Sequence, residues 1–206
     1  MPDSVQVRAR RLTEAKARVE QAALDLFHAH GFNAVTVEQI SDAAGIGPAT
    51  FYRYFGTKYG VLFAYQPLLL AGIRDAVEKS PAELTRSAFL LTVLTTFSTT
   101  IETHSRAMSL RDDIVASDDD LLARTLAVQR AWETQLADSL ARRRGLPTAD
   151  LAAWIEAALG LSVIRVAFRH WRAGHAPSMS EAVEAVFAEA AQTLASPSGR
   201  SADTGL

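Results

Sequence analysis

The segment Thr36–Lys58, TVEQISDAAGIGPATFYRYFGTK, constrains this chain most strongly, because its pattern predicts two short helices joined by a glycine turn. Thr36 with Gln39 three positions later forms a capping box, in which each side chain satisfies a backbone donor near the other residue. Gly45 allows the chain to turn without a Cβ clash. Gly47-Pro48 is typical of a helix start, so the second helix is predicted to begin at Pro48.

The second helix of this segment is predicted to have two different faces. Phe51 and Phe55 are four positions apart and therefore point the same way, so we expect both in a core. Thr50, Arg53 and Tyr54 point elsewhere. An arginine there can donate two parallel hydrogen bonds to guanine O6 and N7, which predicts a DNA-reading face; the alternative is a solvated surface arginine.

The rest of the chain is predicted to be all-α, because apolar residues recur at spacings of three and four and no strand-like alternation persists. The 206 residues are 49% hydrophobic and 21% charged, which is typical of a soluble globular protein. The sequence has no cysteine, which excludes disulfides and thiolate metal sites. We found no signal peptide or run of membrane-spanning length, so we expect a soluble, cytoplasmic protein.

Helix boundaries follow from caps and breakers. The first helix is expected to bury a stripe made of Leu12, Ala15, Val19, Ala22, Leu26 and Phe27, and to end at Gly31. A helix from Thr57 to about Lys79 should bend near Gln66, because Pro67 lies in its interior. Ser80-Pro81-Ala82-Glu83 is a candidate capping box that opens a helix to about His104.

Four more helices and a tail complete the prediction. The helices are expected at residues 106–116, from the acidic residues 118–120 to the arginines 142–144, from 148 to about 173, and from 178 to about 195. Negative charge at 118–120 suits a helix start, and the alternative is a cation site. Residues 197–206 are predicted to be a disordered tail.

The net charge of −2 conceals an uneven distribution. Residues 1–60 hold seven Lys and Arg against six Asp and Glu. This excess does not prove nucleic-acid binding, but a specific reader needs only a local basic edge. Candidates for that edge are Arg8, Arg10, Arg11, Arg53 and Lys58.

The Thr-capped helix, the A-G-I-G turn and the F-Y-R-Y-F core, followed by six more helices, resemble the TetR family of bacterial transcriptional regulators. The resemblance is specific over residues 15–61. It implies a three-helix helix-turn-helix DNA-binding domain at residues 1–56 and a six-helix ligand-binding and dimerisation domain at 57–196. Most members are repressors that their ligand releases from DNA, and they are homodimers through the last two helices.

Carried over position by position, the family's DNA contacts fall on Thr36, Val37, Pro48, Ala49, Thr50, Tyr52, Arg53, Tyr54 and Lys58. Arg10 and Arg11, which are expected to precede the first helix, are further candidates for groove or backbone contact; the alternative is a basic terminus that touches nothing specific. Tyr59-Gly60 departs from the family, which commonly has an acidic residue and a helix former there. We expect Gly60 to weaken the first turn of its helix by up to about 1 kcal/mol.

An elongated hydrophobic effector is expected in the body, and a similarity to a subset of the family suggests an acyl-CoA-like ligand. Helix 80–104 is apolar on most sides and rich in hydroxyls, most of which are expected to bond back to their own helix. The candidate pocket residues are Phe89, Thr92, Thr96, Phe97, Leu110, Leu126, Arg130 and Trp132.

The last two helices carry apolar stripes that predict a two-fold dimer interface, with packing inside one chain as the alternative. The interface candidates are Ile155, Leu159, Val163, Val166, Val183, Val186, Phe187, Ala190 and Leu194. The helix after Thr57, with its bend at Pro67, is a candidate lever between ligand and DNA.

No catalytic motif is present, and the five histidines lack metal-ligand spacing, so we expect no enzyme, no cofactor and no metal site. The predicted function is a ligand-responsive homodimeric regulator that binds a palindromic double-stranded DNA operator. The alternatives are an activator, a ligand-independent regulator, or a helical ligand-binding protein without DNA binding.

Overall fold

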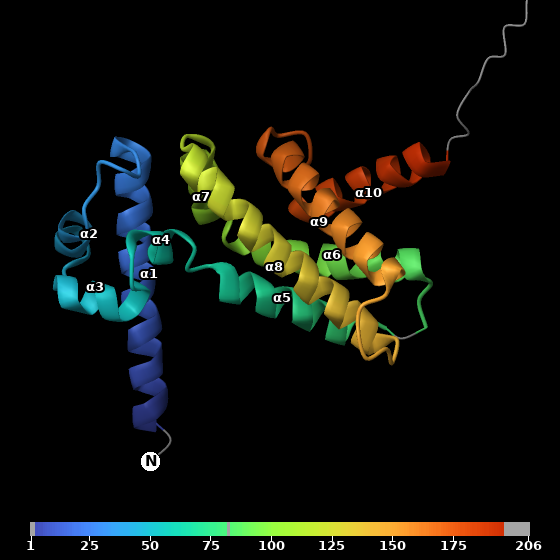
Figure 1. The fold of residues 1–206 in the computed structure, drawn as a ribbon, viewed down its shortest axis with the longest axis horizontal. Coiled ribbons are helices and arrows are strands. Elements are labelled where there is room, and N and C mark those ends of the chain that lie inside the picture. Colours follow the sequence, from blue (N-terminus) through green and yellow to red (C-terminus); the bar gives the residue numbers. More distant parts are fainter. Residues whose placement is uncertain (1–2, 82, 196–206) are drawn as a thin grey trace, which may run out of the picture. The chain divides into compact units, whose positions relative to one another are not determined.

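The computed structural model describes residues 3–81 and 83–195, and within these ranges every regular element is an α-helix (Figure 1). This confirms the predicted all-α class. The helices are α1 (Asp3–His30), α2 (Val37–Ala44), α3 (Pro48–Phe55), α4 (Lys58–Leu62), α5 (Gln66–Lys79), α6 (Arg86–Thr103), α7 (Ser105–Ala116), α8 (Asp119–Arg143), α9 (Leu151–Arg172) and α10 (Met179–Ala195). The tail predicted at 197–206 lies outside the described residues.

The chain divides into two compact units. Unit 1 comprises the residues up to Asp75 together with Thr103–Leu136, and unit 2 comprises Ala76–Glu102 together with the residues from Ala137 onward. The division passes through α5 and α8, so it is not a division between whole helices. The predicted domain boundary after residue 56 stays a prediction.

Unit 1 is built around α1, against which α2, α4 and α7 pack (Figure 1). Its core contains residues of α1 to α4, of which Phe27, Ile40 and Phe51 are buried almost completely. Ile114 of α7 and Leu121 of α8 belong to the same core. We call α1–α4, residues 3–62, the head.

The turn chemistry of the head agrees with the sequence. The Thr36 hydroxyl accepts a hydrogen bond from the Gln39 N–H at 3.2 Å, and the Gln39 side-chain oxygen accepts one from the Thr36 N–H at 2.8 Å. Gly45 ends α2 in the left-handed conformation at φ 67°, where a Cβ would be strained. α3 begins at Pro48 after Gly47, so the capping box, turn and helix start are confirmed.

The predicted helix from Thr57 to Lys79 is wrong, because residues 63–65 interrupt it between α4 and α5. Pro67 is therefore the second residue of α5 and does not bend a helix interior. Backbone N–H groups in a first helical turn have no acceptor within the helix, so a proline there removes no hydrogen bond.

The predicted capping box at residues 80–83 is also wrong. The Ser80 hydroxyl donates to the Ala76 carbonyl at 2.7 Å, so it closes α5 instead of opening the next helix. α6 begins at Arg86, and the Thr85 hydroxyl accepts from the Ala88 N–H at 3.3 Å. Ala82 lies outside the described residues.

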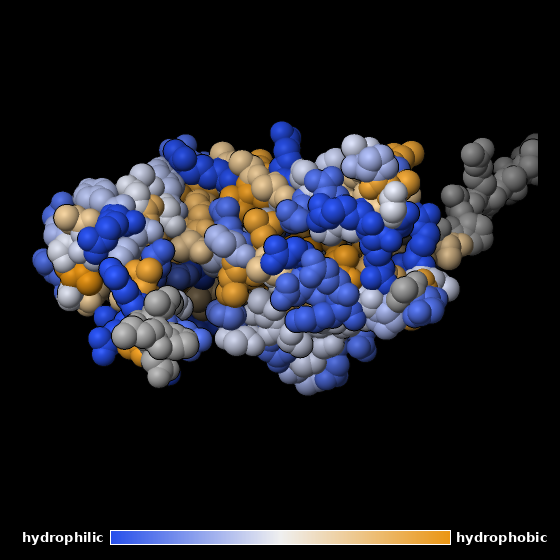
Figure 2. Space-filling model, turned by 90° about the horizontal axis from the view of Figure 1, so that it is seen from below, coloured by the Kyte–Doolittle hydropathy of each residue, from blue (hydrophilic) through white to orange (hydrophobic). Residues whose placement is uncertain are grey.

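Unit 2 contains most of α6, the end of α8, and α9 packed against α10. α9 turns its small residues Ala153, Ala157 and Gly160 inward, which lets neighbouring helices approach closely. Leu151 and Ile155 face outward and are 77% and 57% exposed, whereas Val163 and Phe168 are buried. By length and composition alone α9 is long and apolar enough to cross a membrane. Apolar patches between polar residues are visible on the face shown in Figure 2.

Candidate DNA-binding interface

The recognition face is the exposed side of α3. Phe51 is fully buried and its ring centroid lies 5.5 Å from that of Phe55, so these two aromatic side chains anchor the helix. Pro48, Ala49, Tyr52 and Arg53 are exposed on the other side, while Thr50 and Tyr54 are half-buried. A short helix that is fixed by one aromatic face leaves its other face free for a partner.

The Tyr54 ring lies near two cations. The Arg53 guanidinium carbon lies 5.4 Å from the centre of the Tyr54 ring, and the Lys16 ammonium nitrogen lies 5.8 Å from it. Both are cation–π distances. Lys16 comes from α1, so the recognition face gains a positive charge that the sequence did not reveal, because α1 and α3 are brought together only by the tertiary fold.

At the start of α2, backbone groups are better placed than side chains to contact a DNA phosphate. The Thr36 hydroxyl is engaged in its cap, and the Val37 side chain is buried at 9% exposure. Only the free N–H groups of the first turn of α2 are therefore suited to a phosphate there.

Lys58, predicted to contact phosphate, is directed into the protein. Its ammonium donates to the carbonyl of Phe32 at 2.8 Å, to that of Val35 at 2.7 Å and to that of Asn33 at 3.4 Å. It also lies 4.6 Å from the centre of the Phe32 ring. Burial lowers the pKa of Lys58 from its ordinary value. These contacts fasten the start of α4 to the α1–α2 connection, and a phosphate contact stays a prediction.

Gly60 allows α3 and α4 to meet closely. A Cβ built on Gly60 would lie 2.9 Å from the carbonyl carbon of Phe55 and would overlap its oxygen. The Gly60 N–H is capped by the Thr57 hydroxyl at 3.0 Å. The expected weakening of the helix by Gly60 stays a prediction, and the structure adds that a side chain at this position would collide with the last residue of α3.

The N-terminal arginines do not precede α1 but lie within it, because α1 begins at Asp3. Arg8, Arg10 and Arg11 are exposed, and the Arg10 Nε lies 2.8 Å from the Glu14 carboxylate. Leu12, predicted to be buried, is 43% exposed, since this end of α1 extends beyond the helices that cover its other half (Figure 1).

A buried arginine of α7 contacts α1 and α4 of the head. Arg111 of α7 is 4% exposed, and its Nε donates to the Leu62 carbonyl at 3.0 Å. Its guanidinium forms an ion pair with Glu20 of α1 and lies 4.6 Å from the centre of the Tyr65 ring. Burial lowers the pKa of Arg111 to about 10. No pattern in the sequence marks this cluster, because its members are far apart in the chain.

Tyr65 links this cluster to α8 through a ring contact with Trp132. Its ring is 5.9 Å from that of Trp132, and the two are nearly perpendicular. Burial first, and the Asp112 carboxylate second, raise the pKa of Tyr65 to about 12. Trp132, which was predicted to line a ligand pocket, therefore packs on the turn between α4 and α5.

The other predicted pocket residues are spread over both units. Phe89 and Phe97 are buried within unit 2, whereas Leu126 of unit 1 is 62% exposed. The Thr92 hydroxyl donates to the Ala88 carbonyl at 2.8 Å, as expected for a hydroxyl that bonds back to its own helix. Thr96 and Arg130 are exposed, and Leu110 is packed against the core of the head. A common pocket for these residues stays a prediction.

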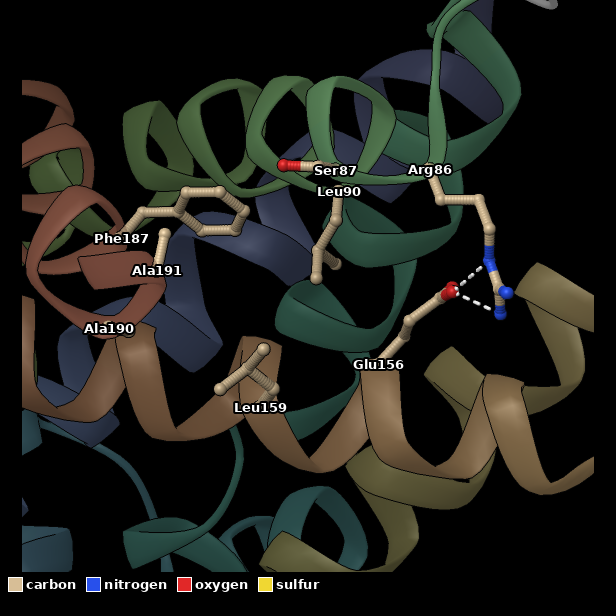
Figure 3. A pocket seen from close by; sticks show the side chains of 8 residues that line it. All are labelled: Arg86, Ser87, Leu90, Glu156, Leu159, Phe187, Ala190 and Ala191. Atoms are coloured by element: carbon tan, nitrogen blue, oxygen red, sulfur yellow. Dashed lines mark hydrogen bonds and ion pairs between the residues drawn. The ribbon is translucent and has the colours of Figure 1, made fainter. Parts of the chain in front are cut away.

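A different pocket, of roughly 220 Å³, lies within unit 2 between α6, α9 and α10 (Figure 3). Its walls are mainly apolar, and at one end the Arg86 Nε donates to the Glu156 carboxylate at 2.7 Å. The lining residues are Arg86, Ser87, Leu90, Glu156, Leu159, Phe187, Ala190 and Ala191.

The predicted dimer residues differ in their exposure. Val163 and Val183 are buried inside unit 2 and offer no surface to a partner, which corrects their assignment. Ile155 and Val166 are exposed by 57% and 39%. Leu159, Phe187 and Ala190 line the pocket, Val186 is half-buried, and the Leu194 side chain lies outside the described residues. Exposed Leu151 and Trp154 were not predicted.

Residues 21–65 match the family model described as bacterial regulatory proteins of the tetR family, and residues 79–195 match the model of the MftR C-terminal domain. No group of three or more potential metal ligands occurs within residues 3–81 and 83–195.

The chain is 28% identical to MftR of Mycobacterium tuberculosis, named as a candidate regulator of mycofactocin biosynthesis, over 91% of this chain and 94% of that protein. It is 33% identical to the regulator TcmR of Streptomyces glaucescens over 39% of this chain and 36% of that protein. Among solved structures, FadR of Thermus thermophilus in complex with lauroyl-CoA has the same fold, with a TM-score of 0.54 at 22% identity over 90% of this chain and 97% of that one. These similarities and the helix-turn-helix geometry show that the chain belongs to the TetR family of bacterial transcriptional regulators.

Proposed function

We propose that this regulator is a cytoplasmic homodimeric repressor that binds a palindromic operator through α3 and is released by an acyl-CoA thioester. The observation that carries the DNA-binding part is the division of α3, in which buried Phe51 fixes the helix while Arg53 and Tyr52 remain exposed. An α-helix presented in this way fits the major groove.

Each side chain of the recognition face has a chemistry suited to a different part of DNA. Arg53 is the proposed base reader, since its guanidinium can donate two bonds to one guanine. Tyr52, Tyr54 and Lys16 are proposed to contact phosphates and thereby to fix the register. Ala49 can make apolar contact with a thymine methyl group.

Dimerisation is supported by the outer face of α9. Leu151, Trp154, Ile155 and Val166 expose large apolar surface along one side of this helix. Such a face is typical of a covered surface, and a two-fold partner would cover it with the same residues. A two-fold dimer can place two recognition helices about 34–36 Å apart, which is one turn of DNA.

The effector class is supported by one comparison, since the solved FadR structure contains lauroyl-CoA. The C-terminal half of this chain matches the MftR domain, and MftR of Mycobacterium tuberculosis is named as a candidate regulator of mycofactocin biosynthesis. Genes of mycofactocin biosynthesis are therefore proposed targets. Release would be a population shift, in which the effector binds better to a conformation that holds the heads away from groove spacing.

The deciding experiment selects duplexes from a random-sequence library with the wild-type chain and measures their affinity for wild type, Arg53→Ala and Arg106→Ala. Arg106 is an exposed arginine on α7 and serves as the matched control. Loss of sequence preference in Arg53→Ala but not in Arg106→Ala supports the assignment. Sequence-blind binding by wild type would instead favour a ligand-binding protein without operator recognition.

Lauroyl-CoA is then titrated into the wild-type complex with the selected duplex. Release of the duplex supports the proposed effector class and repression. An unchanged complex refutes that class and leaves a ligand-independent regulator, whereas tighter binding indicates an activator or co-repressor mechanism. A reporter gene placed behind the selected duplex gives the sign of regulation.

A further inference from the structure

We propose that Arg111 is a positioning residue for DNA binding, because its guanidinium fastens the end of α4 and the middle of α1 to α7. This inference rests on the proposed function, since it concerns how the head is held for operator binding. Glu20, the Leu62 carbonyl, Tyr65 and Arg111 are together called the latch.

The latch joins three separate segments to α7. Arg111 pairs with Glu20 of α1, donates to the last carbonyl of α4 at 3.0 Å, and stacks at 4.6 Å on Tyr65 in the interruption between α4 and α5. Carbonyl groups at a helix C-terminus find no N–H donor within the helix, and they attract cations. One guanidinium therefore satisfies the end of α4 and the carboxylate of α1 together.

The other end of α4 is held independently. Lys58 ties the first residue of α4 to the carbonyls of Phe32 and Val35, and Gly60 places the helix directly against Phe55. A helix of five residues has few internal hydrogen bonds, so such external contacts decide its position. Because α4 supports the C-terminal end of α3, a displacement of α4 would move the recognition face.

In the ion pair of the latch the Arg111 side chain is buried, at 5% exposure, and the Glu20 side chain is partly exposed, at 25%. The same pair of helices carries a natural control. Arg106 of α7 lies 3.6 Å from Asp25 of α1, but these side chains are 79% and 50% exposed. Exposed pairs hold structure weakly, so loss of Arg106 should leave the head in place.

The test uses full-length Arg111→Met, Arg111→Lys, Glu20→Gln and Arg106→Met at a temperature well below the melting point of each. Amide hydrogen exchange is measured at Val61, Phe63, Ala64 and Gln66, whose N–H groups bond to carbonyls in α4 and in the residues that flank it. Affinity is measured for the duplex that wild type selects from a random library.

Arg111→Met is expected to accelerate exchange at these amides and to weaken duplex binding, each at least tenfold. Arg111→Lys should recover part of the affinity because it keeps the charge, and Arg106→Met should stay within twofold of wild type. If Arg111→Met does not fold, Glu20→Gln decides, with an expected change of threefold or more in both measurements.

Wild-type affinity in folded Arg111→Met, or in Glu20→Gln where Arg111→Met does not fold, overturns the proposal, even if the melting temperature falls. Equal losses in Arg106→Met overturn it as well, because the effect would then not be specific to the latch. If wild type selects no duplex, the proposed function fails. Accelerated exchange in Arg111→Met would then still show that Arg111 holds α4, so the two failures are distinguishable.

Discussion

Replacing Gly60 by alanine sets two physical effects of opposite sign against each other. Alanine is favoured over glycine within a helix by about 1 kcal/mol, so propensity alone predicts a more stable protein. The added Cβ, however, would lie 2.9 Å from the carbonyl carbon of Phe55 and overlap its oxygen. That oxygen belongs to the backbone and already accepts the Thr57 N–H at 2.8 Å, so it cannot move as a flexible side chain would.

The steric effect should be the larger one. Overpacking usually costs about 1–3 kcal/mol, and a backbone neighbour favours the upper end of this range. After the gain in helix propensity, the net loss in free energy of unfolding is about 2 kcal/mol. For a chain of this size each kcal/mol lowers the melting temperature by roughly 2–4 °C, so Gly60→Ala should melt about 4–8 °C below wild type.

Thermal unfolding followed by circular dichroism measures this change, with Gly47→Ala as the control. Gly47 also has a negative φ, −79°, and no atom lies within 4 Å of its Cβ position. Its replacement should cost less than about 1 kcal/mol, through a poorer N-cap. A melting temperature of Gly60→Ala equal to or above that of wild type would show that α3 and α4 do not meet as described.

Lys58→Met should lower the free energy of unfolding by about 2 kcal/mol, because the carbonyls that now bond to a charged donor lose their partner. Urea unfolding measures this change. A loss below roughly 0.5 kcal/mol, the scatter for surface substitutions, would contradict it. Lys16→Ala should reduce the salt slope of duplex binding by about 0.9 without altering sequence preference, and an unchanged slope would remove Lys16 from the interface. The pKa of the Tyr65 phenol is raised to about 12, so this group should ionise well above its ordinary pKa of 10.0. The difference between the ultraviolet alkaline titrations of wild type and Tyr65→Phe measures its ionisation. Its contribution to stability is complete below pH 10 and is lost between pH 10 and 12, because the folded state keeps the proton longer; an ionisation near 10 in folded protein would refute the burial.

Local signals in the sequence predicted the head well. Thr36 and Gln39 lie three residues apart, so their capping box depends only on nearby residues, and the periodicity of Phe51 and Phe55 needs no tertiary information. Pro67 was misassigned because a proline in the first turn and a proline in a helix interior look the same in sequence when no cap precedes them.

Contacts between distant segments could not be predicted. The carbonyl acceptors of Lys58 lie more than twenty positions earlier in the chain, so no local pattern predicts that its ammonium bonds inside the protein. Arg111 meets Glu20 and Leu62 only after α7 has packed on α1, and no pattern within α7 marks that arginine. For α9, both faces carry apolar residues, since Val163 and Phe168 are buried while Leu151 and Ile155 are exposed, so hydrophobicity alone could not identify the inward face.

The membership of Ile114 and Leu121 in the core of the head affects how this protein can be recombined with its relatives. A chimera that transferred only residues 1–62 to another body would leave the space of two buried aliphatic side chains to be filled by unrelated ones. Loss of such a side chain costs about 2–5 kcal/mol when the site cannot collapse. An exchange of operator specificity by transplantation should therefore carry α7 and the first turn of α8 along with the helix-turn-helix.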